Sequence, residues 1–207
     1  MKNSLAALTG IWLIGHGTLA IAASTVDLKV QGSITPSACI HTLSQDGAVD
    51  YGKLPAKDLN VDRITVLAPV TLKLNIECEA PALFTLNARD NRLGSSYLPS
   101  RNSYGLGLVN GDQQLGRYGV NVLNPVADSP VYPLISLDQG TSWIVNPSGS
   151  YLQHDALNAF GDSPTPKALR NVAVDLVIST HIAPSKTLNL TGEVPLDGSA
   201  TVELRYL

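Results

Sequence analysis

Residues able to do chemistry are few in this chain of 207 residues, and they are not grouped. His41, His154 and His181 each lack a metal-ligand residue two to four positions further on, so we expect solvated histidines and no metal site. Glu77 and Glu79 flank Cys78 and would point to the same face of a strand, which would allow a carboxylate pair. The solvated face of a strand accounts for them better. The sequence therefore predicts no catalytic residue here.

The sequence also contains no complete motif for a catalytic nucleophile or for binding a cofactor. There is no Gly-x-Ser-x-Gly nucleophile elbow and no Gly-x4-Gly-Lys phosphate loop. Gly105 and Gly107 are followed by Gly111, one position too late for a dinucleotide fingerprint, and close strand packing with a turn at Asn110-Gly111 explains them. We expect a non-enzymatic protein without a cofactor.

Charge and composition exclude further classes. The 17 acidic side chains outnumber the 14 basic ones, which argues against a nucleic-acid partner because such a protein needs a basic face. With 44% hydrophobic and 15% charged residues, the chain is neither disordered nor a coiled coil.

The first segment has the pattern of an export signal. Residues 1–22 carry one charge, Lys2, near their start, continue through an apolar stretch, and end in small residues with an expected cleavage site after Ala22. A retained membrane anchor is the alternative interpretation. An exported chain meets an oxidising compartment, so Cys39 and Cys78 are predicted to form a disulfide, with two buried thiols as the alternative.

In the elements that must position these residues, apolar and polar side chains alternate with a period of two residues. Apolar side chains alternate with polar ones in runs that predict strands over residues 26–34, 70–78, 84–88, 106–108, 118–122, 172–178 and 200–206. The best helical candidate, Leu152 to Phe160, is short, and residues 124–167 are predicted to be long surface loops around one or two short strands. This pattern indicates an all-β, antiparallel β-sandwich.

Four motifs resemble, in order, the pilins of the bacterial chaperone–usher pathway. The segment from Gly32 to Cys39 is similar to the pilin opening, and Val49 to Leu54 to the strand that follows it. An alternating strand then ends at Cys78, and the last strand has Tyr206 next to the C-terminus. The middle of the chain is longer than usual, so a less-characterised fimbrial-subunit-like branch is indicated.

This resemblance implies an immunoglobulin-like sandwich that lacks its last strand and carries one disulfide. It divides the chain into a signal peptide at 1–22, an N-terminal extension at 23–34 and a pilin-like domain at 35–207. A periplasmic chaperone, and then the extension of another pilin subunit at an outer-membrane usher, would fill the open groove. The implied donor side chains are Val26, Leu28 and Val30, and the implied groove-edge side chains are Ala200, Val202, Leu204 and Tyr206.

The expected function is that of a structural subunit of a bacterial surface fimbria, exported through the periplasm and supporting cell adhesion. Two alternative functions stay open. Residues 24–34 would be the first strand of a closed sandwich in a stand-alone secreted or periplasmic binding protein. Tyr132, Trp143 and Tyr151 would stack on a host glycan or contact a receptor in a single-domain adhesin, or they simply pack at the rim of the sandwich.

Overall fold

The computed structural model describes residues 29–31 and 38–207. The chain divides into two compact units, residues 1–34 and 35–207, and every helix and strand described lies in the second unit. The predicted signal peptide lies outside the described residues, as does most of the predicted extension. Among the described residues, no helix has both the length and the apolar character needed to cross a membrane.

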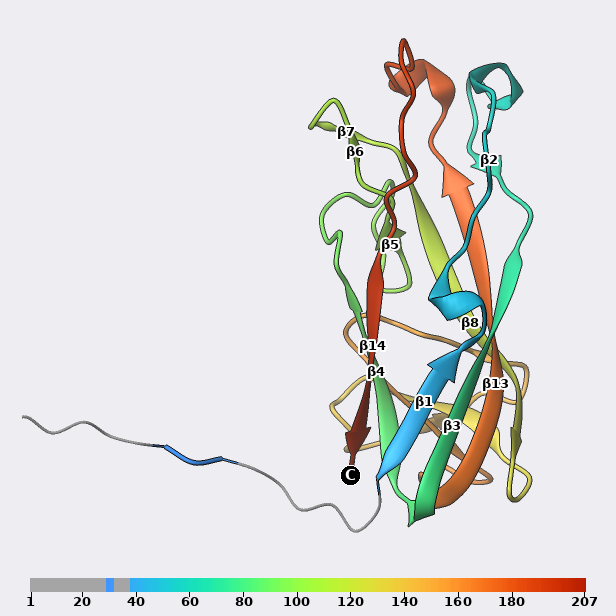
Figure 1. Ribbon diagram of the computed structural model, residues 1–207, viewed down its shortest axis with the longest axis vertical. Helices are drawn as coiled ribbons and strands as arrows, with labels where there is room; N and C mark the ends of the chain where they lie inside the picture. Colours follow the sequence, from blue (N-terminus) through green and yellow to red (C-terminus); the bar gives the residue numbers. More distant parts are fainter. Residues whose placement is uncertain (1–28, 32–37) are drawn as a thin grey trace, which may run out of the picture. The chain divides into compact units, whose positions relative to one another are not determined.

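The second unit is a sandwich of two antiparallel sheets (Figure 1). In the first sheet the order is β1 (Cys39–Leu43), β3 (Val70–Ala82), β13 (Leu169–Ile182), β8 (Gly116–Ala127) and β11 (Ser150–Tyr151), with β2 (Thr65–Val66) on β13 and β5 (Tyr104–Gly105) on β8. The second sheet has the order β10 (Ile144–Val145), β9 (Tyr132–Ser136), β12 (Leu157–Gly161), β4 (Phe84–Asp90) and β14 (Ala200–Tyr206). Two short strands, β6 (Leu108–Val109) and β7 (Gln113–Gln114), form a separate hairpin; the 3-10 turns are η1 (Ser44–Gly47), η2 (Ala56–Asp58) and η3 (Ser185–Thr187).

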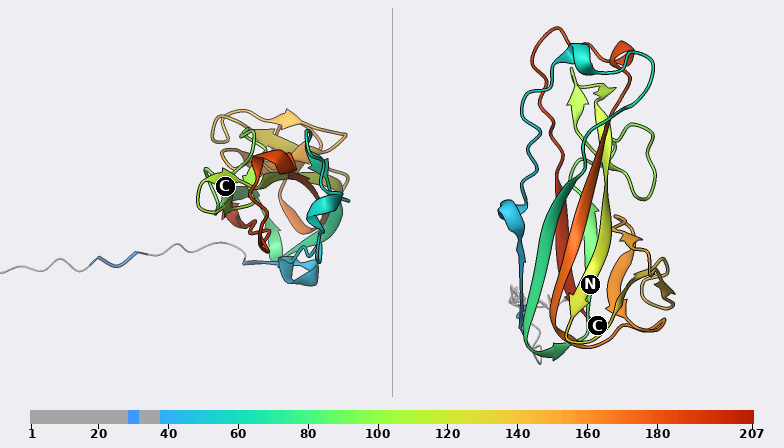
Figure 2. Two further views of the ribbon diagram at one scale, coloured as in Figure 1. Left: turned by 90° about the horizontal axis from the view of Figure 1, so that it is seen from above. Right: turned by 90° about the vertical axis from the view of Figure 1, so that its right-hand side faces the viewer.

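The long strands β3, β8 and β13 run along the length of the sandwich and give it its core (Figure 2). In β3 the side chains of Leu72, Leu74, Ile76 and Cys78 are buried, and in β13 those of Val172, Val174, Leu176 and Ile178 are buried. The alternate residues of both strands face outward, because successive side chains of a strand point to opposite faces. The period-two prediction and the sandwich fold class are confirmed.

The disulfide prediction is also confirmed. Cys39 and Cys78 face each other in the register of β1 and β3, and their sulfur atoms are bonded. The bond fixes the first residue of β1 to the buried face of the first sheet, where Cys78 is 1% exposed.

Three local expectations differ from the structure. Residues 49–54 are not a strand: they pair with no other strand among the described residues, and Gly52 has a positive φ of 62°. The predicted strand through Leu106 and Leu108 is interrupted at Gly107, where φ is 86°, so only short β5 and β6 form. The helical candidate at 152–160 overlaps β12, since pairing with β4 and β9 overrides a weak local preference.

The region predicted as surface loops contributes much of the second sheet. Residues 124–167 contain β9, β10, β11 and β12, and Leu134, Leu157 and Phe160 are buried there. Proline, serine and glycine mark the turns between these strands, but the strands themselves are too short to show a clear period.

Candidate functional site: a groove between two unpaired edges

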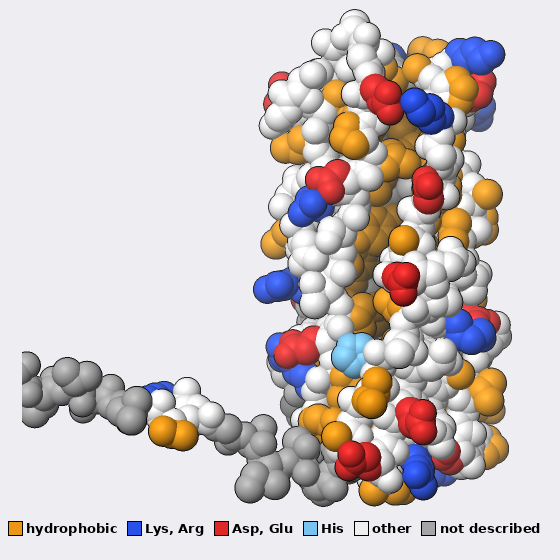
Figure 3. Space-filling model, in the orientation of Figure 1, with side chains coloured by type: hydrophobic (Ala, Val, Ile, Leu, Met, Phe, Trp, Pro, Cys, Tyr) orange, Lys and Arg blue, Asp and Glu red, His pale blue; other side chains and the backbone are white. Residues whose placement is uncertain are grey.

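Each sheet has an outer strand on the same side of the sandwich, and among the described residues the outer edge of that strand pairs with no other strand. Among the described residues, β1 is the outer strand of the first sheet and β14 is the outer strand of the second. Irregular segments at 48–55 and 189–199 continue these two edges beyond the strands. We call the interval between the edges the groove, and Figure 3 shows hydrophobic side chains gathered along a hollow on this face.

Two cavities open into the groove. The first, of about 280 Å³, is lined on its floor by core side chains, among them Leu72, Tyr118 and Ile178. The second, of about 510 Å³, lies between residues 49–59 and 190–196 and reaches Leu115 and Ile182. These core side chains are largely buried, but in the groove they line open cavities and not the face of a further described strand.

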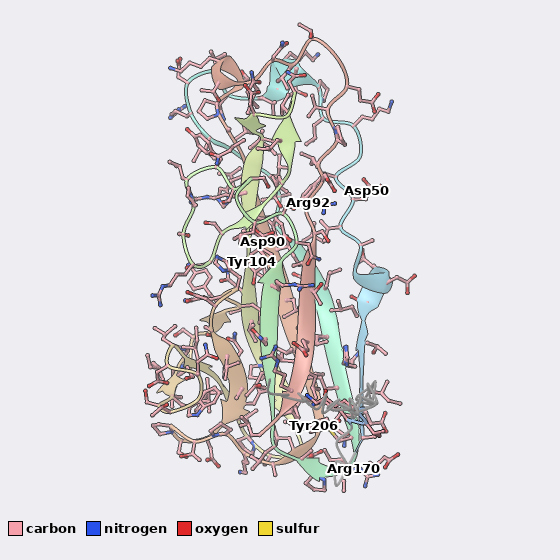
Figure 4. All side chains as sticks on the ribbon, turned by 90° about the vertical axis from the view of Figure 1, so that its left-hand side faces the viewer. Asp50, Asp90, Arg92, Tyr104, Arg170 and Tyr206 are labelled. Atoms are coloured by element: carbon pink, nitrogen blue, oxygen red, sulfur yellow. A yellow bond between two sulfur atoms is a disulfide. The ribbon has the colours of Figure 1, made fainter. Side chains whose placement is uncertain are left out.

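Apolar side chains of the terminal strand lie beside this groove. Ala200 and Val202 line the first cavity, and Leu204 packs against the hydrophobic core. Tyr206 is 37% exposed and lies near one end of the sandwich (Figure 4). The opposite edge of β14 is paired with β4 over its whole length, from Ala200 to Tyr206, so only one side of the strand is free among the described residues.

Two contacts join the edges across the groove. At one end, the backbone N–H of Cys39 donates a hydrogen bond to the Tyr206 hydroxyl over 2.8 Å. At the second cavity, Lys53 Nζ lies 3.7 Å from Glu193 Oε2. The lysine and glutamate side chains are 90% and 84% exposed, and such a solvated pair contributes little to stability. The Tyr206 bond therefore closes one end of the groove, while the other end is held loosely.

An ion pair anchors the segment that leads into β14. Arg92 follows β4, and its Nε and Nη2 atoms donate to the two carboxylate oxygens of Asp197 over 2.8 and 2.7 Å. This fork holds the pKa of Asp197 below its usual value, chiefly through the hydrogen bond. The backbone N–H of Asp197 also donates to the carbonyl of Leu106, so both the side chain and the backbone fix this edge of the groove.

Buried polar groups stabilise the floor beside this anchor. Asp90 is 6% exposed, and its two oxygens accept hydrogen bonds from the backbone N–H groups of Arg92 and Gly105. Tyr104 is fully buried, stacks on Tyr118 with ring centroids 5.2 Å apart, and donates to the carbonyl of Leu152 over 2.6 Å. Burial raises the pKa of the Tyr104 hydroxyl, so this group stays a hydrogen-bond donor. Figure 4 shows Asp90 and Tyr104 close together at this level.

The structure does not place all the predicted site residues. Val26 and Leu28 of the predicted donor segment lie outside the described residues, and Val30 is 88% exposed. Their role stays a prediction. The sequence analysis did not identify four residues that line or anchor the groove: Tyr51, Thr180, Arg92 and Asp197. In the sequence, Asp197 was notable only as part of a predicted turn. No sequence pattern pairs it with Arg92, which lies 105 positions away.

The three candidate ligand-binding aromatics do not form a cluster of rings. Tyr132 lies on β9 and is 45% exposed, Tyr151 lies on β11 and is 48% exposed, and Trp143 is partly buried before β10. The ring contacts found among the described residues involve Phe84, Phe160, Tyr104, Tyr118 and His154, and none of these three.

Comparison with known proteins gives distant relatives. Residues 28–103 match a family described as a protein of unknown function (DUF1120). Protein GltF of Escherichia coli is 25% identical over 232 aligned positions, which cover 91% of this chain and 91% of GltF. The uncharacterized protein YhcF of the same organism is 23% identical, covering 90% of this chain and 92% of that protein.

Among solved structures, one chain from the structure of a chaperone–usher pilus aligns with 90% of this chain and 98% of its own length. Its sequence identity is 15% and its TM-score is 0.32. By sequence, the chain is a distant relative of GltF and YhcF, with which it aligns over about nine tenths of its length.

Proposed function

We propose that this chain is a structural subunit of a bacterial surface fimbria, and that its groove is filled by an extended strand from a second copy. The observation that carries the proposal is the free edge of β14 opposite the free edge of β1, with apolar cavities between them. A strand added there gains backbone hydrogen bonds along the edge, and its alternate side chains enter the cavities.

Residues 24–34 of another copy are the proposed occupant. Val26, Leu28 and Val30 share one face of an extended segment, and burying three such side chains contributes roughly 5–8 kcal/mol before ordering costs. The opposite face carries Asp27 and Lys29, one charge of each sign, to lie beside the outward Glu203 and Arg205 of β14.

The connection to the domain favours a second copy over the chain's own segment. Cys39 lies at the end of the groove that Tyr206 closes. The chain's own segment is tied to Cys39 through residues 35–38 only, whereas a segment from another copy can enter the groove from either end.

The proposal extends to the assembly route. An unpaired apolar edge is an aggregation hazard, so a subunit waiting for its partner needs a protecting strand. A periplasmic chaperone that lends such a strand, and an outer-membrane usher at which the next subunit replaces it, are the proposed partners. The proposed location is the periplasm in transit and then the cell surface, where the fibre supports adhesion without catalysis.

Size measurement tests the proposal. The oxidised chain of residues 23–207 is expected to form concentration-dependent oligomers in light scattering, while a variant lacking 23–34 stays monomeric. That variant should bind a synthetic peptide of residues 24–34 and melt at a higher temperature with it. A peptide with serine at positions 26, 28 and 30 is the control and should not bind. If the longer chain stays monomeric and the shorter variant ignores the peptide, the proposal is wrong.

A further inference from the structure

The two cavities of the groove share three lining side chains, whose position we call the waist. Val49, Tyr51 and Leu196 line both cavities, the first two from the β1 edge and Leu196 from the β14 edge. An extended strand that fills both cavities must therefore pass between them. Large alternate side chains fit on either side of the waist, where the cavity volumes are about 280 and 510 Å³.

The Tyr51 ring is fixed at the waist by its hydroxyl. It donates a hydrogen bond to Thr180 Oγ1 over 3.0 Å, and Thr180, on β13, is 1% exposed and lines the first cavity. Moving the ring aside would take this partner away from a buried hydroxyl in apolar surroundings, which is unfavourable. Residues 49–54 belong to no strand, so this hydrogen bond takes the place of sheet pairing in holding Tyr51 over the core.

We propose that Tyr51 sets the register of the strand that occupies the groove, because the anchored ring admits only a small side chain at the waist. This inference rests on the proposed function and adds a specificity-determining residue to the same site. A strand with a large side chain at the waist must either displace the ring or shift by two residues, which empties one cavity. Tyr51 thus selects among apolar strands that are otherwise equivalent.

Peptide competition during refolding tests the inference on the full mature chain. The oxidised chain of residues 23–207 is refolded from urea with fluorescent peptides of residues 24–37, and the bound peptide is measured by gel filtration. Five variant peptides carry phenylalanine at positions 26, 28, 30, 32 or 34 in turn. We expect one of them to bind about tenfold more weakly than the unchanged peptide, since overpacking costs that much.

Substitution at Tyr51 identifies the cause of that weak binding. Tyr51→Ala should restore the one weak peptide to within about threefold of the unchanged peptide and leave the other four unaffected. Tyr51→Phe keeps the ring and removes its anchor, so it should restore binding in part. Thr180→Val removes the acceptor instead, provides a second variant if Tyr51→Ala does not fold, and should act in the same direction.

The outcomes separate the two proposals. If no peptide binds in any variant, the strand-filled groove is wrong. If peptides bind but phenylalanine is tolerated equally at all five positions, or the weak position stays weak without the Tyr51 ring, the role of Tyr51 is wrong. A uniform loss for all peptides would mean that Tyr51 only supports folding, and it would overturn the inference as well.

Discussion

At the scale of single residues, Tyr206 joins the two sheets through one hydrogen bond at the closed end of the groove. Tyr206→Phe removes the acceptor and leaves the ring in place. The free energy of unfolding in urea should fall by about 0.5–1 kcal/mol, since Cys39 N–H then has only water as a partner. Tyr132→Phe, on an exposed ring of β9, is the control and should change nothing. Equal unfolding curves for both variants would show that the bond does not hold the groove end.

Asp138 gives the fold a dependence on acidic pH. Its carboxylate accepts hydrogen bonds from the Ser142 side chain, the Ser142 backbone N–H and the Ser136 hydroxyl. These bonds, with that of the Ser142 hydroxyl foremost, lower the pKa of Asp138 to about 2 from the usual 3.8. A depressed pKa in the folded state means that the stabilisation is complete above about pH 4 and is lost as the pH falls towards 2.

Asp138→Asn tests this dependence. Between pH 4 and pH 2, the unfolding free energy of the unchanged chain should fall more steeply than that of the variant, because asparagine has no proton to bind. Asp46→Asn, in the turn before residue 48, is a matched control with the same charge change. Urea unfolding at pH 5, 3 and 2 measures the difference, and parallel curves for the Asp138 variant and the unchanged chain would contradict it.

At the scale of elements, the disulfide attaches β1 to β3 and so positions one edge of the groove. Replacing both Cys39 and Cys78 by alanine should lower the unfolding free energy by about 4 kcal/mol, because the bond closes a loop of 39 residues in the unfolded chain. Urea unfolding measures this. The reduced, unsubstituted chain should behave like the double variant, and a loss below about 1 kcal/mol in both would show that the strand pairing alone fixes β1.

The segment before β14 depends on the Arg92–Asp197 fork. Asp197→Asn removes the charge and one of the two acceptor oxygens, so amide hydrogen exchange should become faster in residues 190–199, while the amides of β13 keep their rates. Lys167→Met, which breaks the exposed Lys167–Asp162 pair, is the control for a lost surface charge. Unchanged exchange at 190–199 would mean that the backbone bond of Asp197 to Leu106 suffices.

Element prediction succeeded where a strand is long and has one buried face. The alternation in β3, β13 and β14 is regular over seven residues or more, so period two identified them. It failed for β9 to β12, whose two to five residues give too short a sample of the period. The strand expected at 49–54 came from the resemblance to pilins and not from the period, and these residues pair with no other described strand.

At the scale of the whole molecule, an open groove makes stability depend on concentration. The melting temperature of the chain of residues 23–207 should rise with its concentration, since each copy that binds a strand of another is stabilised by mass action. The variant without residues 23–34 should melt at one temperature at all concentrations. Differential scanning calorimetry over a hundredfold range of concentration measures this, and a constant melting temperature for both chains would indicate a sandwich complete within one copy.

The sequence alone determined the fold class, the disulfide and the alternating pattern of the last strand. Each depends on local pattern or on cysteine count, and the order of the motifs then indicated a fimbrial-subunit-like protein. The tertiary structure decided that β1 and β14 lie at the same side of the sandwich, that Tyr206 reaches Cys39, and that Arg92 pairs with Asp197. Those contacts join residues more than 100 positions apart, and no periodicity encodes such a distance. They follow from the packing of two sheets, which brings distant edges together to bury the core.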